Sequence, residues 1–274
     1  MIQLGLIGYP LGHSLSPKIH GAALKACGLN GNYSLFPIDR DDKQGLKDLL
    51  GRIRSGEITG LNVTIPHKQN VIEFMDELTP TAQAIGAVNT IYMHENKLIG
   101  ENTDAPGFLS DLKRVMFTSQ SVIENRKSAI VLGAGGSARA VVYALCNDGW
   151  DVTIAARRIE QAQQLSQSFG KYDLRLSTFD FQPSTFDLIV NTTPLGMTPN
   201  IEASPLPENI TLSPNTVIYD LVYNPRETKL VRDARAQGLS ATTGLGMLIE
   251  QAALAFEKWT GVNPDRAAMQ RAVS

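Results

Sequence analysis

Hydroxyl, amide and charged side chains gather in four short clusters in the first part of the chain. The clusters occupy residues 8–17, 62–68, 86–90 and 102–107. Nearly all of them lie at the predicted end of a strand, where α/β proteins place groups that bind ligands. They include one ammonium, Lys68, and one carboxylate, Asp104. Hydroxyls and an ammonium can bind a carboxylate, whereas amides and a carboxylate bind alcohols, so the set suits a small, heavily hydroxylated acid.

The same residues also have structural explanations. Ser14 and Ser16 lie at the start of a predicted helix with a proline in its first turn, so they could cap that helix. Thr64 is β-branched and suits a strand, while Asn89 and Asp104 suit turns or helix caps. The four histidines lack the spacing of metal ligands, so we expect structural or surface histidines and no metal site. Taken singly, these residues leave both explanations open.

A glycine-rich motif follows a strand of small apolar residues. Residues 129–132 lead into a segment that fits G-x-G-x-x-A, namely Gly133, Ala134, Gly135, Gly136, Ser137 and Ala138. Gly133 allows the tight turn, Gly135 lets the backbone approach a pyrophosphate, and Ala138 permits close packing of helix and strand. A purely structural turn is the alternative, but the predicted strand and helix on either side favour a dinucleotide site.

The end of the next predicted strand distinguishes between the two nicotinamide dinucleotides. An NAD site usually has an acidic residue there, which binds the ribose hydroxyls. This chain has Ala156, Arg157 and Arg158 instead. Guanidinium groups suit bidentate contacts with a 2′-phosphate, although two arginines could also form a solvated helix start. The sequence therefore favours NADP over NAD.

The elements that must position these residues alternate between strands and helices, which is typical of a parallel sheet covered by helices. In the first part we expect a turn at 96–102, strands at 3–9, 32–39, 58–65 and 88–93, and helices at 15–28, 41–55 and 67–77. In the second part we expect helices at 107–117, 137–148, 158–169, 227–237 and 247–260, and strands at 128–133, 151–156, 173–178, 187–191 and 217–222. Residues 242–246 break this pattern. Two α/β units therefore share the chain.

Composition and charge point to a small-molecule ligand. The 274 residues carry a formal net charge of −2, with both signs scattered, which gives no electrostatic footprint for nucleic acid or a membrane surface. We find no signal peptide or membrane span, and Cys27 and Cys146 read as free thiols, so we expect a cytoplasmic protein. Residues 193–214 contain five prolines and should form a surface connection near the ligand.

Three later clusters decide between the structural and functional explanations. They are Asn-Thr-Thr-Pro-Leu-Gly-Met at 191–197, Asp-Leu-Val-Tyr-Asn-Pro at 220–225 and Gly-Leu-Gly-Met-Leu-Ile-Glu-Gln at 244–251. Together with the earlier clusters, and in this order, they resemble the shikimate dehydrogenase family over essentially the whole chain. The resemblance implies an α/β fold with two domains. An N-terminal substrate domain would comprise residues 1–105 plus 245–274, to which the C-terminal helices return, and a Rossmann-type NADP-binding domain would comprise residues 106–244.

Carried over position by position, the resemblance implies reduction of 3-dehydroshikimate to shikimate with NADPH. Lys68 matches the catalytic lysine of the family and Asp104 its partner at the reacting oxygen. The substrate carboxylate would be bound by Ser14, Ser16 and Thr64, with Tyr223 nearby, and the ring hydroxyls by Asn89, Asp104 and Gln251. The cofactor would contact Gly133, Ala134, Gly135, Gly136, Ser137, Ala156, Arg157, Arg158, Leu221 and Gly244.

Two departures from the family pattern concern the cofactor. Members that bind NADP commonly have Asn-Arg-Thr where this chain has residues 156–158, and a further arginine where it has Gln161. The asparagine contact is therefore missing, and Arg158 would take over part of the work of the absent arginine.

Three alternative functions remain at this stage. A quinate/shikimate dehydrogenase with broader substrate and cofactor use would need nearly the same residues, although quinate users often carry threonine in place of Ser16. A catalytically silent NADP-binding module would not need Lys68 and Asp104. A folate-linked dehydrogenase would leave the serine cluster and Gln251 unexplained. The sequence leaves the choice between a monomer and a homodimer open.

Overall fold

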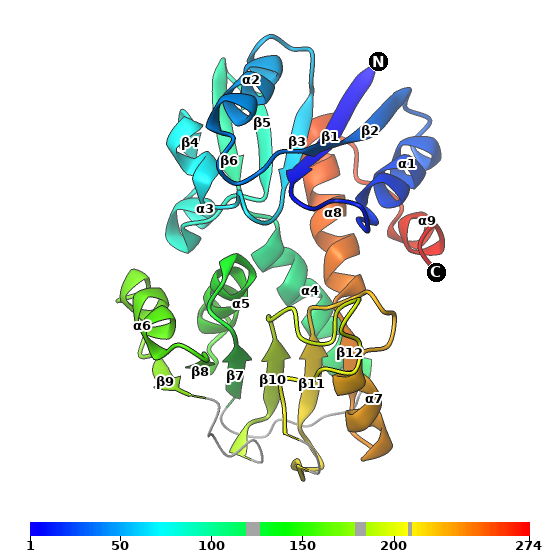
Figure 1. The fold of residues 1–274 in the computed structure, drawn as a ribbon. Coiled ribbons are helices and arrows are strands. Elements are labelled where there is room, and N and C mark those ends of the chain that lie inside the picture. The colour runs from blue at the N-terminus through cyan, green and yellow to red at the C-terminus, as the bar shows by residue number, and fades with distance from the viewer. Residues whose placement is uncertain (119–126, 179–184, 208–209) are drawn as a thin grey trace. The chain divides into compact units, whose positions relative to one another are not determined.

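The protein is described by a computed structural model that covers residues 1–118, 127–178, 185–207 and 210–274 and forms two compact units (Figure 1). One unit consists of Met1–Gly107 and Ile249–Ser274, and the other of Phe108–Leu248. The predicted α/β class and the return of the C-terminal helices to the first unit are confirmed. No helix of the described residues is both long and apolar enough to cross a membrane.

The first unit is built on a six-stranded mixed sheet of order β2-β1-β3-β5-β6-β4. Its strands are β1 Ile2–Gly8, β2 Gly31–Pro37, β3 Gly60–Val63, β4 Glu77–Leu78, β5 Thr90–His94 and β6 Lys97–Glu101. Its helices include α1 Ser16–Ala26, α2 Lys43–Arg54, the 3₁₀ helix η1 Asn70–Phe74, α3 Pro80–Ile85 and α9 Arg266–Arg271. The neighbours β1 and β3 run parallel, whereas β5 runs antiparallel to both β3 and β6.

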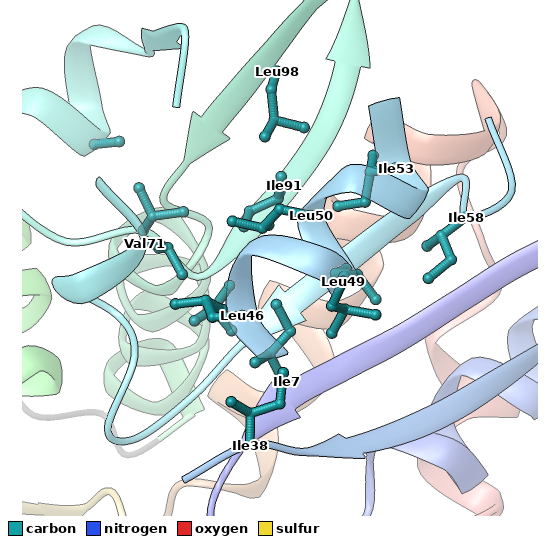
Figure 2. Packing of buried hydrophobic residues seen from close by; sticks show 14 residues of the cluster. Ile7, Ile38, Leu46, Leu49, Leu50, Ile53, Ile58, Val71, Ile91 and Leu98 are labelled. Atoms are coloured by element: carbon teal, nitrogen blue, oxygen red, sulfur yellow. The ribbon is translucent and has the colours of Figure 1, made fainter. Parts of the chain in front are cut away.

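Helix α2 packs on this sheet through one apolar face (Figure 2). Leu46, Leu49, Leu50 and Ile53 follow the i, i+3, i+4, i+7 spacing of a helical stripe, and all four are buried against the strands. Burial of each such side chain contributes about 1.5–3 kcal/mol. The helix begins where the Asp42 carboxylate accepts the backbone N–H of residue 45 at 2.8 Å. This packing holds β1 beside β3, so their carboxyl ends share one edge of the sheet.

Helix α8 Leu245–Thr260 packs against the same sheet through its C-terminal half. Trp259 donates its indole N–H to the carbonyl of Ile91 in β5 at 3.1 Å. Gly60 makes room for the indole, because a Cβ at this position would lie 2.2 Å from the ring. His20 of α1 stacks on Tyr33 of β2, with ring centroids 4.4 Å apart, and its centroid lies 5.3 Å from that of Trp259.

The prediction of a turn at 96–102 was wrong, because residues 97–101 form strand β6. Strands β5 and β6 make a hairpin in which His94 pairs with Lys97. The two residues between them, Glu95 and Asn96, both have positive φ, as two-residue hairpin turns of type I′ require.

The predicted helix at 67–77 was also wrong, because only the short η1 forms there and β4 follows it. The Asp76 backbone N–H donates to the carbonyl of Leu98 at 2.9 Å, and its carboxylate accepts the Leu98 N–H at 2.7 Å. Pairing with the sheet edge thus overrides the local helical pattern. The other predicted elements are present with shifted ends.

The second unit contains a fully parallel sheet of order β12-β11-β10-β7-β8-β9. Its strands are β7 Ser128–Leu132, β8 Asp151–Ala155, β9 Arg175–Ser177, β10 Leu188–Asn191, β11 Val217–Asp220 and β12 Ala241–Thr243. Its helices include α5 Gly136–Asn147, α6 Ile159–Ser168, α7 Lys229–Ala236 and, from Phe108 onward, α4 Asp104–Thr118, whose first residues belong to the first unit. Counted along the chain, the strand order is the 3-2-1-4-5-6 of dinucleotide-binding folds, with its switch point between β7 and β10. The segment expected to break the pattern contributes its sixth strand, β12.

Candidate active site

The four polar clusters of the first unit meet at one edge of its sheet. Strands β1 and β3 end there side by side, β5 begins there, and β6 ends opposite the start of β5. The Val63 N–H donates to the carbonyl of Asn89 at 2.8 Å, and the Asn89 N–H donates to the carbonyl of Glu101 at 3.0 Å. The segments that carry Lys68, Asn89 and Asp104 are therefore neighbours in space.

Lys68 and Asp104 form a close ion pair at this edge. The Lys68 ammonium donates to Oδ2 of Asp104 at 2.6 Å, and their side chains are only 12% and 7% exposed. The backbone of Lys68 is fixed as well, because its carbonyl accepts the N–H of Val88 at 2.7 Å. An ion pair in such a place is screened less by water than a surface pair. An ammonium has two further N–H bonds, which leaves Lys68 able to donate to a ligand.

Asn89 joins this pair to Gln251 of α8. Its Oδ1 accepts the backbone N–H of Thr103 at 2.7 Å, and a backbone N–H is an unambiguous donor, so the orientation of the amide is settled. Its Nδ2 then donates to Oδ1 of Asp104 at 2.9 Å and to Oε1 of Gln251 at 3.2 Å. All four side chains predicted for the reacting end of the site thus form one hydrogen-bonded group.

The predicted acid-binding hydroxyls lie at the carboxyl ends of β1 and β3. Ser14 Oγ accepts the Ser16 N–H at 3.3 Å, a local contact at the start of α1. The N-cap residue of α1 is Leu15, and no side chain caps this helix. The hydroxyls of Ser16 and Thr64 form no hydrogen bond with any other described residue, which leaves them able to donate to a ligand. Tyr223 belongs to the second unit, where burial raises the pKa of its hydroxyl.

The glycine motif of the second unit has the shape that a dinucleotide requires. Gly133 has φ +113°, and a Cβ there would lie 2.6 Å from Thr192 Oγ1, so only glycine fits. Gly135 is the N-cap of α5, no side chain caps this helix, and a Cβ on Gly135 would meet nothing within 4 Å. Ala138 is fully buried against the sheet. The open helix N-terminus therefore suits a pyrophosphate, with Ala134, Gly136 and Ser137 half-buried beside it.

Two unpaired arginines follow β8. Arg157 and Arg158 are exposed, and neither guanidinium group forms an ion pair or hydrogen bond with another described residue. Both guanidinium groups are thus available to an anion. Ala156 is buried and has no polar side chain, so it makes no contact of the asparagine type. Near the end of β11, the backbones of Leu221 and Gly244 approach closely, because a Cβ on Gly244 would lie 2.2 Å from the Leu221 carbonyl oxygen.

Two buried threonines belong to the site but were not predicted from the sequence. Thr90 Oγ1 donates to Oδ1 of Asn89 at 3.1 Å, and the Thr103 hydroxyl lies 3.2 Å from the same oxygen. They help to fix the Asn89 amide. The available signal was their position, because each directly adjoins a predicted site residue, Asn89 or Asp104.

Comparisons with known proteins agree with this geometry. Residues 6–91 match the shikimate dehydrogenase substrate binding domain, 118–229 the shikimate / quinate 5-dehydrogenase model, and 244–273 the shikimate 5′-dehydrogenase C-terminal domain. A shikimate dehydrogenase (NADP(+)) of Carboxydothermus hydrogenoformans is 42% identical over 274 residues, which cover 98% of this chain and 95% of that protein.

Solved structures give the same result. A shikimate dehydrogenase in complex with NADP+ has a TM-score of 0.91 at 37% identity, covering 100% of this chain and 94% of the other. The shikimate 5-dehydrogenase of Thermus thermophilus in complex with NADP(H) and shikimate has a TM-score of 0.87 at 38% identity, covering 99% and 98%.

Proposed function

The chain belongs to the shikimate dehydrogenase family, and from this premise we propose that it reduces 3-dehydroshikimate to shikimate with NADPH in aromatic amino acid biosynthesis. The observation that carries the proposal is the little-exposed ion pair of Lys68 and Asp104, joined through Asn89 to Gln251. A family likeness alone would allow a silent member, but this group has the chemistry that a ketone reduction needs.

In the proposed site, one end binds the acid and the other binds the ring alcohols. Ser14, Ser16 and Thr64 would donate to the substrate carboxylate, and the family resemblance also assigns Tyr223 to substrate binding. The free hydroxyls of Ser16 and Thr64 support this role. Asn89, Asp104 and Gln251 would bind the ring hydroxyls, because amide and carboxylate oxygens accept from alcohols.

Lys68 would act on the reacting oxygen. Bound NADPH supplies the hydride, and the carbonyl oxygen of the substrate gains negative charge as the hydride arrives. The Lys68 ammonium would stabilise that charge and donate a proton to the oxygen. Asp104 holds the ammonium at 2.6 Å and limits its movement, so Lys68 is positioned before the substrate binds. In the oxidation direction Lys68 would take the proton back.

The second unit would bind the cofactor through three groups of residues. Gly133, Gly135 and the residues between and after them would hold the pyrophosphate at the N-terminus of α5. Arg157 and Arg158 would bind the 2′-phosphate, because both are exposed and unpaired within the described residues. Ala156, Leu221 and Gly244 would contribute backbone or apolar contacts.

Quinate is the competing substrate, because the family model that matches residues 118–229 covers shikimate and quinate enzymes together. A spectrophotometric assay of nicotinamide reduction separates the possibilities, with shikimate or quinate offered together with NADP+ or NAD+. We expect the highest kcat/KM with shikimate and NADP+. Preferred use of quinate would establish the broader enzyme, and absence of turnover with every pair would establish a silent module.

A further inference from the structure

A buried carboxylate at the end of β11 has no part in the reaction as proposed. Asp220 is the last residue of β11, and its exposure is 0%. No cationic side chain among the described residues pairs with it. Burying a carboxylate without a cation generally opposes folding, so stability alone gives a poor reason for its presence.

Three neutral donors from different segments converge on Asp220. Asn191, at the end of the neighbouring β10, donates its Nδ2–H to Oδ1 at 2.8 Å. The backbone N–H of Val222 donates to the same oxygen at 3.0 Å. Thr228, the N-cap residue of α7, donates its hydroxyl to Oδ2 at 2.7 Å. Asp220 thereby fixes the first residues after β11 and the start of the next helix.

Asn191 extends the same network into the segment after β10. Its Oδ1 accepts both the backbone N–H of Thr193, at 3.0 Å, and the Thr193 hydroxyl, at 2.7 Å. Its Nδ2 also donates to the carbonyl of Leu195 at 3.3 Å. Residues 192–195 and 221–228 are therefore tied together through one amide and one carboxylate.

Both segments border the proposed cofactor site at the carboxyl edge of the sheet. The hydroxyl of Thr192 is the atom that a Cβ on Gly133 would meet, and the carbonyl of Leu221 is the atom that a Cβ on Gly244 would meet. We propose that Asp220 is a positioning residue, which holds these two segments in the shape that binds NADP(H). The inference rests on the proposed function, because it takes this edge as the cofactor site.

The electrostatics of Asp220 give the test its discriminating power. Burial raises the pKa of the carboxyl above its ordinary value, and the Thr228, Val222 and Asn191 donors offset only part of that effect. Burial thus makes the charged form of Asp220 less favourable than it is in water. A neutral amide at this position removes the buried charge, so Asp220→Asn should not lower the melting temperature at neutral pH. If Asp220 served only to stabilise the fold, Asp220→Asn would lower the melting temperature.

The experiment measures NADP+ binding to the full chain by titration calorimetry, without substrate, in Asp220→Ala and Asp220→Asn. Asp220→Ala leaves three donors without an acceptor and should raise the dissociation constant about tenfold or more. Asp220→Asn keeps one acceptor oxygen and should raise it less, by about threefold. Circular dichroism and the melting temperature report whether each variant folds. If Asp220→Ala fails to fold, the dissociation constants of Asp220→Asn and Thr228→Val for NADP+, measured by the same titration, test the inference.

Asp187 offers a matched control at the opposite edge of the same sheet. Its carboxylate accepts the backbone N–H and the hydroxyl of Ser128, at 2.9 and 2.7 Å. Asp187→Asn should leave NADP+ binding unchanged. An unchanged dissociation constant in folded Asp220 variants, or an equal loss in Asp187→Asn, would overturn the inference. If the unaltered protein binds NADP+ but turns over no substrate, the proposed function fails while the role of Asp220 is still decided.

Discussion

At the residue scale, the Lys68–Asp104 pair brings two opposite charges within 2.6 Å of each other in a place with little exposure to water. In the proposed mechanism, only these two residues make interactions that are stronger in the transition state than with the bound substrate. We expect Lys68→Ala to lower kcat by about 10²- to 10⁴-fold, the usual loss when acid–base catalysis is removed. KM for shikimate should change much less, and steady-state kinetics measure both.

A surface lysine serves as the control. Lys97 pairs with Glu77 at 2.9 Å with both side chains exposed, so Lys97→Ala should leave kcat unchanged. Asp104→Asn should also lower kcat severely. The double variant should lose little more activity than the less active single variant, because the two residues act as a unit. Near-normal turnover in folded Lys68→Ala would refute the mechanism, and additive losses would show that the two residues do not act as a pair.

Residue types alone predicted what these side chains can bind, but not how they are held. The clusters around Lys68, Asn89 and Asp104 were recognisable because amides and charges stand at strand ends. The roles of Thr90 and Thr103 were missed, because a threonine beside a strand has an ordinary structural explanation. Only the contacts to Asn89 Oδ1 reveal that their hydroxyls orient the amide.

At the element scale, the turn between β8 and α6 presents Arg157 and Arg158 to solvent. We expect Arg157→Ala/Arg158→Ala to weaken NADP+ far more than NAD+, because only NADP+ carries a 2′-phosphate. A hydrogen bond to a charged group contributes about 1.5–3 kcal/mol, so the pair could account for about 10²-fold in preference. Dissociation constants for both dinucleotides provide the measurement.

An exposed arginine elsewhere in the second unit serves as the control for the loss of positive charge. Arg232 of α7 pairs with Glu202 at 2.8 Å, and Arg232→Ala should leave the preference for NADP+ unaltered. Equal weakening of NADP+ and NAD+ by the double substitution would contradict the assignment of the 2′-phosphate to this turn.

The elements that the sequence predicted well are those whose own residues carry the signal. Helix α2 shows its stripe at Leu46, Leu49, Leu50 and Ile53, and the structure confirms it. Strand β4 has no such signal, since pairing with β6 decides its conformation. Helix α3 was missed although Thr79 caps it, a proline begins it and a left-handed glycine ends it, because six residues are too few for a periodic pattern.

At the scale of the whole molecule, the strand order of the second unit follows from the sequence motif more directly than that of the first. A glycine motif between a strand and a helix specifies a dinucleotide fold, and the 3-2-1-4-5-6 order agrees with it. The first sheet mixes parallel and antiparallel neighbours, and no local pattern predicts its order. The return of residues 249–274 to that sheet came only from the family resemblance, since Trp259 and Ile91 lie far apart in the chain.

His20 should make the stability of the molecule depend on pH. Its ring is fully buried between α1, α8 and β2, and burial lowers its pKa from 6.5 to about 3, which the Asn62 side chain opposes only in part. In the unfolded chain His20 therefore becomes protonated below about pH 6.5, whereas in the folded protein it stays neutral down to about pH 3. Stability is fully present above pH 6.5 and falls as the pH drops, by about 1.4 kcal/mol per pH unit from this group.

Removing this imidazole should flatten that dependence. His20→Leu introduces an apolar side chain of similar volume that cannot take up a proton in the unfolded state. The difference in unfolding free energy between pH 7 and pH 4 should therefore shrink. Urea unfolding at the two pH values, followed by circular dichroism, provides the measurement.

His94 is exposed at the end of β5, and His94→Gln should retain the slope of the unaltered protein, because its ring meets water in both states. Carboxylates also contribute to acid unfolding, but their contribution is common to both variants. An unchanged slope in His20→Leu would show that His20 becomes protonated in the folded protein near pH 4, with its packing between Tyr33 and Trp259 opened to admit water.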